Sequence, residues 1–211
     1  SVFNGCTKLE NITIPKSVIN IGTYAFRNCE SLQSITIPEG VKETGEEIFK
    51  QCKSLKNVTL PKSLTKISDE MFYGCDVLEN IIIPENVTDI GVNAFYHCPV
   101  LKNINIPKHI TSIADGTFSY CSGLESITIP DGVTSIGKDA FSNCTALKNI
   151  VLPKGVTNIG NDAFKSSGLK SITIPEGITS IGNGAFGYSA PFETQNQLNN
   201  VLIISDDPEH P

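Results

Sequence analysis

The sequence contains few aromatic residues and no tryptophan. Aromatic side chains make up 7% of its 211 residues, so a conventional globular core built on large aromatic side chains is not expected. Lysine and arginine never form a run and the formal net charge is −6, which gives no indication of a surface for nucleic acid or an anionic membrane. No apolar stretch approaches the ~20 residues that a membrane-spanning helix requires, and we expect no membrane insertion of this segment.

The most prominent feature of the sequence is a unit of 23 residues that recurs along most of the chain. Phenylalanine recurs at this step from Phe3 to Phe164, cysteine recurs from Cys6 to Cys144, and a proline keeps the same spacing. The unit reads F-x-x-C-x-x-L-x-x-I-x-I-P-x-x-V-x-x-I-x-x-x-A, and the eighth copy lacks one residue and the cysteine. A fixed period of this length is typical of solenoids, in which each unit stacks on its neighbours.

Each part of the unit predicts a local structure, as the copy around residues 124–144 shows. Alternating β-branched residues at 124–129 predict a short strand, which Pro130 ends because proline has no N–H to donate. Residues 133–137 predict a second short extended segment, and residues 139–144 predict a single helical turn. One unit cannot bury its apolar face alone, but stacked units can, with strands ~4.8 Å apart.

The repeated motif resembles the BspA-type leucine-rich repeat, which is found in surface proteins of bacteria and some protists. The resemblance covers residues 3–186 and implies a leucine-rich-repeat solenoid of stacked 23-residue coils with a parallel β-ladder on its concave side. The short second strands and the single helical turns are then expected on the other side. The family also implies adhesion or binding at a cell surface or outside the cell.

The domain organisation follows from where the repeat stops. We expect residues 1–186 to form eight repeats, the first truncated in mid-repeat, and residues 187–211 to form a C-terminal cap. Within this cap, the spacing of Leu198, Val201 and Ile203 predicts a vestigial ninth strand. Because the chain opens part-way through a repeat, we also expect it to be a piece of a longer protein that carries any targeting segment.

The seven cysteines are predicted to form a ladder of buried, reduced thiols. Their number is odd and no C-x-x-C occurs, which excludes the usual zinc and thioredoxin-like spacings. Stacking at ~4.8 Å places neighbouring Cα atoms within disulfide range, but parallel side chains leave the Cβ atoms slightly beyond the usual ~3.5–4.5 Å. We therefore expect all seven thiols to be inaccessible, and a bridge between two coils is the alternative.

No motif indicates an enzyme, a metal site or a cofactor. The sharpest catalytic option is a Cys/His pair formed by His97 and Cys98, since the two residues are adjacent. However, Cys98 occupies the same inward repeat position as six other cysteines that have no histidine nearby. The chain also lacks the glycine-rich and histidine-rich motifs of nucleotide-binding proteins, hydrolases and metalloproteases.

The residue after each strand proline alternates in charge through all eight repeats. These residues are Lys16, Glu39, Lys62, Glu85, Lys108, Asp131, Lys154 and Glu176. In a parallel stack they are neighbours, and opposite charges there favour the correct register by a few tenths of a kcal/mol, on the order expected for exposed pairs. The alternative interpretation is an acid–base surface for a ligand.

A candidate binding surface is indicated where the outward positions depart from their polar pattern. Outward strand positions are mostly Thr, Ser and Asn, but Ile82, Asn105 and Val151 interrupt the Thr row, and repeats four and five carry extra apolar residues. The candidate set is Tyr73, Val77, Ile82, Tyr96, Val100, Thr59, Asn80, Asn103, Asn105 and Thr128. A packing interpretation stays open for the tyrosines, in which Tyr73 and Tyr96 stack on each other and cover the phenylalanines.

The leading functional prediction is a non-catalytic binding or adhesion module of a cell-surface or secreted protein. Its partner would be another protein or a host or matrix surface component. The second prediction is a structural spacer within a larger surface protein, with no ligand of its own.

Overall fold

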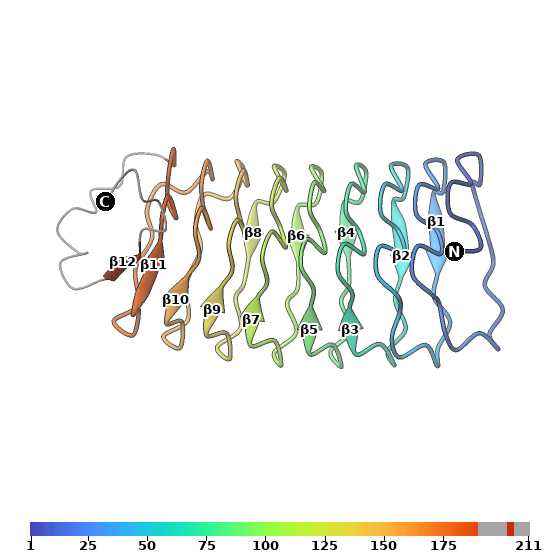
Figure 1. Cartoon of the computed structure of the whole chain (residues 1–211), viewed down its shortest axis with the longest axis horizontal. Coiled ribbons are helices and arrows are strands. Elements are labelled where there is room, and N and C mark those ends of the chain that lie inside the picture. The colour runs from blue at the N-terminus through green and yellow to red at the C-terminus, as the bar shows by residue number, and fades with distance from the viewer. Residues whose placement is uncertain (190–201, 205–211) are drawn as a thin grey trace.

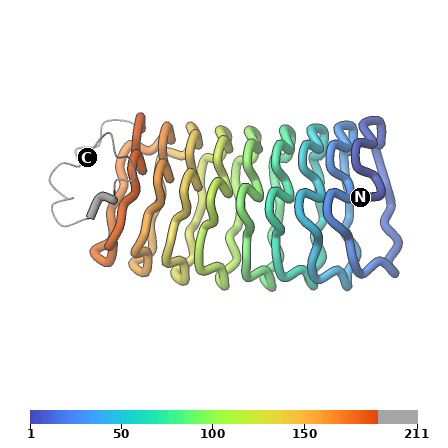
Figure 2. Tube along the Cα trace, viewed as in Figure 1, coloured from blue at the N-terminus to red at the C-terminus, as the bar shows by residue number. Residues whose placement is uncertain are grey.

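The computed structural model describes residues 1–189 and 202–204. It is a rod of stacked coils that follow one another in a nearly straight row (Figure 1). The Cα trace repeats one coil shape along the whole described rod (Figure 2). We number the coils by their phenylalanines, so that coil 1 begins at Phe3 and coil 8 at Phe164. The predicted leucine-rich-repeat solenoid is therefore confirmed.

A first ladder is formed by the strands that precede five of the repeat prolines, in coils 2 to 6. It contains β1 (Ser34–Thr36), β2 (Asn57–Thr59), β4 (Asn80–Ile81), β6 (Asn103–Ile104) and β8 (Ser126–Ile127). β1 pairs with β2, and β4, β6 and β8 form a separate three-stranded sheet. Pairing is parallel and joins residues 23 positions apart, as in Ile35 opposite Val58, because only this register keeps every inward side chain inside.

A second ladder is formed by the extended segment after the proline turn. It contains β3 (Lys66–Ile67), β5 (Asp89–Ile90), β7 (Ser112–Ile113), β9 (Ser135–Ile136), β10 (Asn158–Ile159), β11 (Ser180–Gly182) and β12 (Leu202–Ile204). β3 pairs with β5, and β7, β9, β10, β11 and β12 form one parallel sheet. The predicted short second strands are thus present.

The last strand does not take the place that its sequence spacing predicted. The prediction aligned Ile203 with the first ladder, but Ile203 lies opposite Ile181 in the second ladder. The edge strand of a sheet offers unpaired backbone N–H and C=O groups. A terminal strand can pair with these groups whether or not its side chains follow the repeat motif, so the motif does not decide which ladder it joins. Leu198, Val201 and most of the expected cap lie outside the described residues.

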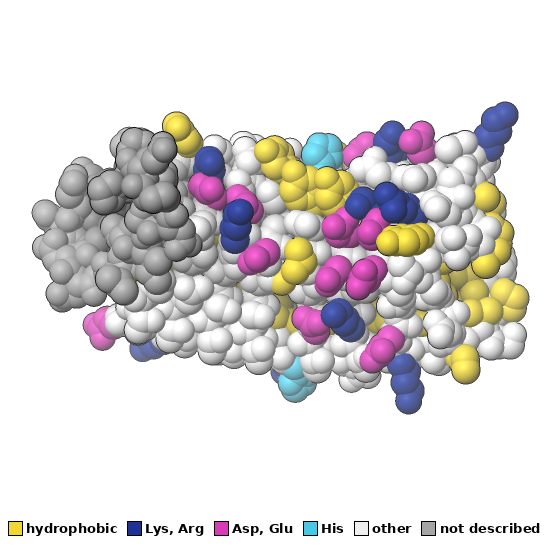
Figure 3. All heavy atoms as spheres, viewed as in Figure 1, with side chains coloured by type: hydrophobic (Ala, Val, Ile, Leu, Met, Phe, Trp, Pro, Cys, Tyr) yellow, Lys and Arg dark blue, Asp and Glu magenta, His cyan; other side chains and the backbone are white. Residues whose placement is uncertain are grey.

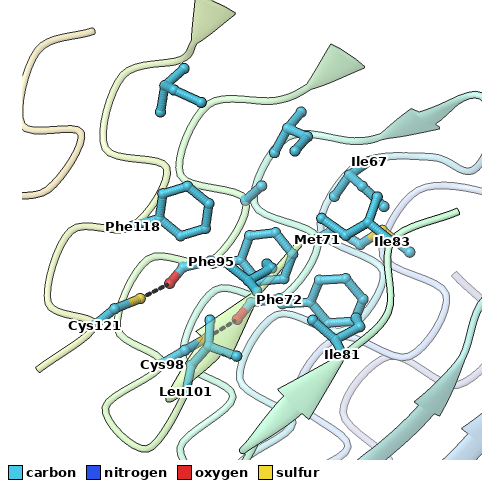
Figure 4. Packing of buried hydrophobic residues seen from close by; sticks show 14 of the residues in the cluster. Ile67, Met71, Phe72, Ile81, Ile83, Phe95, Cys98, Leu101, Phe118 and Cys121 are labelled. Carbon is cyan, nitrogen blue, oxygen red and sulfur yellow. Dashed lines mark hydrogen bonds between the residues drawn. The ribbon is translucent and has the colours of Figure 1, made fainter. Parts of the chain in front are cut away.

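The core is a stack of phenylalanine rings along the rod axis. Successive ring centroids from Phe3 to Phe186 lie 5.2–5.7 Å apart. Figure 4 shows the surrounding packing, in which the Cys98 Sγ donates to the Phe72 carbonyl at 3.2 Å. The same bond joins each cysteine from Cys29 onward to the phenylalanine carbonyl of the preceding coil. The thiols therefore satisfy buried carbonyls as well as filling space.

One part of the cysteine prediction is wrong. All seven cysteines are free, as expected, and six are buried, but Cys6 is exposed. Cys6 belongs to coil 1, which has no coil stacked on that side in this chain. Burial of a cysteine therefore depends on the neighbouring coil, which the repeat motif alone does not supply.

The predicted helical turn is replaced by consecutive tight turns. At the junction of coils 6 and 7, Asp139 has a φ of 54°, and four residues later Asn143 has a φ of 60°. Left-handed residues at these positions cannot continue an α-helix. The Phe141 N–H, at the start of coil 7, instead donates at 2.7 Å to the carbonyl of Ala163, which lies one turn of the solenoid further along. This side of the rod therefore also contributes hydrogen bonds between successive turns.

Glycine permits the closest approach between coils in the second ladder. In four coils a glycine directly follows the second extended segment, and its N–H donates to an isoleucine carbonyl of the preceding coil at 2.8–2.9 Å. These glycines are Gly45, Gly91, Gly137 and Gly160. A Cβ on Gly160 would lie 2.5 Å from the Lys138 nitrogen and 2.6 Å from the Gly137 carbonyl carbon. These are backbone atoms, so a larger residue must separate the two coils.

The two coils without this glycine coincide with the two breaks in the second ladder. Ser68 stands at this position in coil 3 and Ala114 in coil 5. The ladder is interrupted on the preceding side of each, since β3 pairs only with β5, and β7 pairs only with β9. At the first break the Ser68 hydroxyl bonds to the Gly45 carbonyl at 2.8 Å. At both breaks, a residue with a Cβ therefore stands where the other coils of the second ladder carry glycine.

We expect Gly160→Ala to lower the free energy of unfolding by about 1–3 kcal/mol, the usual cost of overpacking. Gly132→Ala is the matched control, because its Cβ would lie 3.5 Å from the nearest carbonyl, an ordinary contact. At a site where alanine fits without strain, it raises the free energy of unfolding by about 0.4–1 kcal/mol, because it reduces the conformational entropy of the unfolded chain. Urea unfolding of both variants measures the difference, and equal stability would contradict a steric role for Gly160.

We expect alkylation of the native protein to label one thiol, Cys6, and alkylation in denaturant to label seven. Burial is the largest cause that raises the pKa of Cys29 to about 11 and that of Cys52 to about 12, and only the thiolate reacts. Mass spectrometry after treatment with iodoacetamide counts the labels. Native labelling of two or more thiols would show that the coils open more readily than their packing indicates.

Candidate binding surface

The outward side of the first ladder is polar over most of its length. Thr59, Asn80, Asn103 and Thr128 from the predicted set are all exposed on it. Asn103 also accepts a hydrogen bond through its Oδ1 from the Ser126 hydroxyl at 2.8 Å. These exposed side chains can donate and accept hydrogen bonds.

This ladder opens between coils 3 and 4. Between coils 2 and 3 the Ile37 N–H donates to the Thr59 carbonyl at 2.9 Å. No corresponding backbone bond joins residues 57–60 to residues 80–83 in the part of the chain that the structure describes. A groove of about 750 Å³ lies here, with Leu60, Ile81 and Ile83 among its lining residues.

Ile82 stands at this groove and is 80% exposed. It occupies the row where other coils carry mainly threonine. Asn105, one coil further, does not remain free: its Oδ1 accepts from the Ile83 N–H at 3.3 Å and its Nδ2 donates to the Ile83 carbonyl at 3.1 Å. Asn105 therefore completes the ladder between coils 4 and 5, a role that its outward position did not reveal.

Val77 and Val100 line a second hollow on the same face. This hollow measures about 770 Å³ and shares Asn57 with the groove beside Ile82. At its rim Lys102 Nζ donates to Glu79 at 2.8 Å, and this hydrogen bond lowers the pKa of the Glu79 carboxyl. The structure thus brings Val77, Val100 and Ile82 to one continuous surface.

The tyrosines lie elsewhere, on the turn side, and they are packed. The Tyr73 and Tyr96 rings stack with centroids 4.6 Å apart, and Lys50 Nζ lies 4.8 Å from the Tyr73 centroid. Both tyrosines are half-buried. The stacking expected under the packing interpretation is present, and the tyrosines do not share a face with the valines.

An ion-pair cluster continues the tyrosine stack toward the N-terminus. Glu47 lies 3.2 Å from both Arg27 and Lys50, and Lys50 also pairs with Glu70. Burial disfavours the charge of Lys50, but hydrogen bonds with Glu70 and Glu47 outweigh it and raise the pKa of the ammonium. Figure 3 shows hydrophobic and charged side chains side by side over the central coils. These charges are paired with one another, although the Arg27 Nε is buried without a hydrogen-bond partner in the described part of the chain.

The alternating charges after the prolines are not used within the chain. All eight side chains are exposed, and no ion pair of 4 Å or less joins any two of them in the described residues. Only the Glu39 carboxylate reaches its neighbour, by accepting from the Lys62 N–H at 3.1 Å. The side-chain ladder that we expected to fix the register is therefore absent within one rod.

The candidate set leaves out Val151, an exposed apolar residue of the first-ladder side. Val151 is 82% exposed on the same row as Ile82, three coils further along. It lies at a groove of about 990 Å³ between coils 7 and 8. The sequence signal for Val151 was an aliphatic residue in a row that is mostly threonine. No other outward apolar residue lies close to it in the sequence, so it did not stand out as part of a binding surface.

The Cys/His option finds no support in the geometry. Cys98 is fully buried, and its thiol is directed at the Phe72 carbonyl. Burial raises its pKa well above the usual value. His97 is exposed, and its Nδ1 lies 3.4 Å from Asp76. Among the described residues no three His, Cys, Asp or Glu side chains gather as metal ligands, and no helix is long and apolar enough to cross a membrane.

Both the strand ladders and the repeated core define a leucine-rich-repeat solenoid. The sequence pattern of the BspA type leucine rich repeat region matches residues 1–125 and 111–207 in six copies. The chain therefore belongs to the BspA-type leucine-rich repeat family. A comparison with curated protein sequences gives no match.

Several solved structures share the fold. A leucine-rich repeat protein from Bacteroides ovatus is 30% identical with a TM-score of 0.71, over 88% of this chain and 55% of that one. The leucine-rich repeat protein of T. pallidum is 28% identical with a TM-score of 0.70, over 74% of this chain and 75% of that one. A leucine-rich cell surface protein from Faecalibacterium prausnitzii is 28% identical with a TM-score of 0.52, over 97% of this chain and 71% of that one. The chain thus spans about half the length of the Bacteroides protein.

We expect the double variant Tyr73→Ser, Tyr96→Ser to lose stability without losing a binding surface. An aromatic pair contributes about 0.5–1.5 kcal/mol beyond its buried area, so the free energy of unfolding should fall by at least that amount. Tyr120→Ser is the control, because Tyr120 is 43% exposed and only tilted against Tyr96. Denaturant unfolding compares the variants, and an unchanged stability of the double variant would return the tyrosines to the candidate contact residues.

Proposed function

We propose that the chain is a non-catalytic protein-binding module of a cell-surface or secreted protein, and that its partner contacts the first-ladder side of coils 3–5. The observation that carries this proposal is Ile82, which is 80% exposed beside an apolar-lined groove. A single exposed aliphatic residue is ordinary on a protein surface. An exposed residue next to a groove and continuous with two further exposed valines is typical of a contact site.

The composition of this surface supports a protein partner. Ile82, Val77 and Val100 provide apolar contacts, and polar side chains such as Asn80 and Asn103 surround them. Apolar centres within polar rims are the usual anatomy of protein interfaces. We infer that the partner is another protein or a host or matrix surface component, with the polar side chains fixing its orientation.

The surface location rests on the relatives. The Faecalibacterium protein, 28% identical over 97% of this chain, is described as a cell surface protein. We propose the same exposed location for this chain, at a cell surface or outside the cell. A catalytic role receives no support, because the sharpest candidate thiol, Cys98, is buried and engaged with a backbone carbonyl.

We expect Ile82→Thr to weaken binding by tenfold or more while leaving the fold intact. Threonine is the residue that this row carries in most coils, so the change removes the apolar contact without introducing a foreign residue. The probes are collagen, fibronectin and mucin, each immobilised on a biosensor surface. Circular dichroism confirms that the variant is folded.

Val92→Thr is the matched control for this experiment. Val92 is exposed to a similar degree as Val77, but it follows the second segment and lines neither hollow. Binding by the wild type and by Val92→Thr, together with its loss in Ile82→Thr, supports the proposal. Equal binding by all three proteins would move the contact away from Ile82.

A structural spacer is the second candidate, and the continuous ring stack favours it. Nine phenylalanine rings, from Phe3 to Phe186, stack without interruption within the described residues. Such a stack holds a rod extended whatever its surface carries. Absence of binding to every probe would favour this candidate.

A further inference from the structure

Two exposed aliphatic side chains define a pair of contact points on the first-ladder side. Ile82 in coil 4 is 80% exposed and Val151 in coil 7 is 82% exposed. They stand on one row, three coils apart, which corresponds to a separation of ~14 Å at ~4.8 Å per coil. Each lies at a groove where the strand ladder is open. Because the coils follow one another in a nearly straight row (Figure 1), an extended partner can reach both contact points.

We propose that this partner is a second copy of the chain, bound face to face with the two rods antiparallel. The proposal deepens the binding function above, since it uses the same surface. The two copies are related by a two-fold axis that runs along the strand direction. The coils of the second copy then run in the opposite order, and each strand position faces the same strand position of the other copy. Coil 4 then faces coil 7 of the other copy, so Ile82 meets Val151 twice in one symmetric interface.

The alternating charges select this antiparallel arrangement. When coil 4 faces coil 7, coil 5 faces coil 6 and coil 3 faces coil 8. Opposite charges then meet in every pair, namely Lys108 with Asp131, Glu85 with Lys154, and Lys62 with Glu176. A parallel face-to-face arrangement needs a two-fold axis along the rod. That axis reverses the strand direction, so the row of charges would not face the same row of the other copy.

These charges are available for such a contact. All six side chains are exposed, and none takes part in an ion pair within the described residues. Alternation alone would allow several antiparallel registers that differ by two coils. The positions of Ile82 and Val151 select one register among them, because only this one brings both aliphatic residues together.

The area of the contact predicts a weak, reversible dimer. Five coil spacings and seven strand residues give a face of roughly 24 Å by 23 Å. Two such faces bury about 1,100 Å², which is at the lower end for specific interfaces. We therefore expect weak, reversible self-association rather than an obligate dimer.

Charge exchange across the proposed contact tests the arrangement. Lys108→Glu and Asp131→Lys should each weaken self-association at least tenfold, because each change creates two like-charge pairs. The double variant Lys108→Glu, Asp131→Lys should restore the wild-type dissociation constant, since opposite charges then meet again. Sedimentation velocity of the whole chain from about 1 to 200 µM measures the association, a range set by the expected weak affinity.

Lys16→Glu is the matched control, because coil 1 lies outside the contact between coils 3–8 of the two copies, and the variant should associate as the wild type does. Circular dichroism confirms folding of each variant. A wild-type chain that stays monomeric throughout, or a double variant that fails to recover, would overturn the dimer. Either outcome would leave the wider function standing if Ile82→Thr still lost binding to a matrix protein, so the two proposals fail separately.

Discussion

Every feature of this rod depends on the contact between one coil and the next. A single 23-residue unit has an apolar face that it cannot bury, and its neighbours supply the missing surface. The Phe49 and Phe72 rings, with centroids 5.6 Å apart, are one step of this stack. The thiol of Cys75 donating to the Phe49 carbonyl at 3.3 Å is the polar counterpart of the same contact. Where no neighbour stacks, as at Cys6, the same residue type is exposed.

The spacing between coils also explains where the ladders break. Glycine at the end of the second segment lets adjacent backbones approach closely, and Ser68 and Ala114 prevent this in two coils. The first ladder opens at a different place, between β2 and β4, next to Ile82. The central coils therefore combine irregular backbone pairing with exposed apolar side chains. A perfectly regular stack would present only a polar face, so the departures from the repeat are the places where a specific contact can form.

The two sides of the rod use their side chains differently. On the turn side, Lys50 pairs with Glu47 and lies over the Tyr73 ring, so these charges and rings contact one another within the molecule. On the first-ladder side, Ile82 and the charges after the prolines have no such partners in the described chain. Groups that one chain leaves unsatisfied are the ones that a partner can engage. This difference is why the tyrosines are interpreted as packing residues and the aliphatic row as a contact surface.

The sequence by itself determined the solenoid, the register and the identity of the core. A period of 23 residues that recurs without a slip leaves one way to bury Phe95, Cys98 and Leu101 together. The tertiary structure decided the rest, because it depends on backbone positions that a motif does not encode. The two left-handed residues at 139 and 143 replace a helical turn, the exposed Asn105 side chain bonds to the Ile83 backbone, and β12 joins the second ladder. Each outcome was set by which backbone groups lay within hydrogen-bonding distance once the coils were stacked, a distance that side-chain spacing alone does not specify.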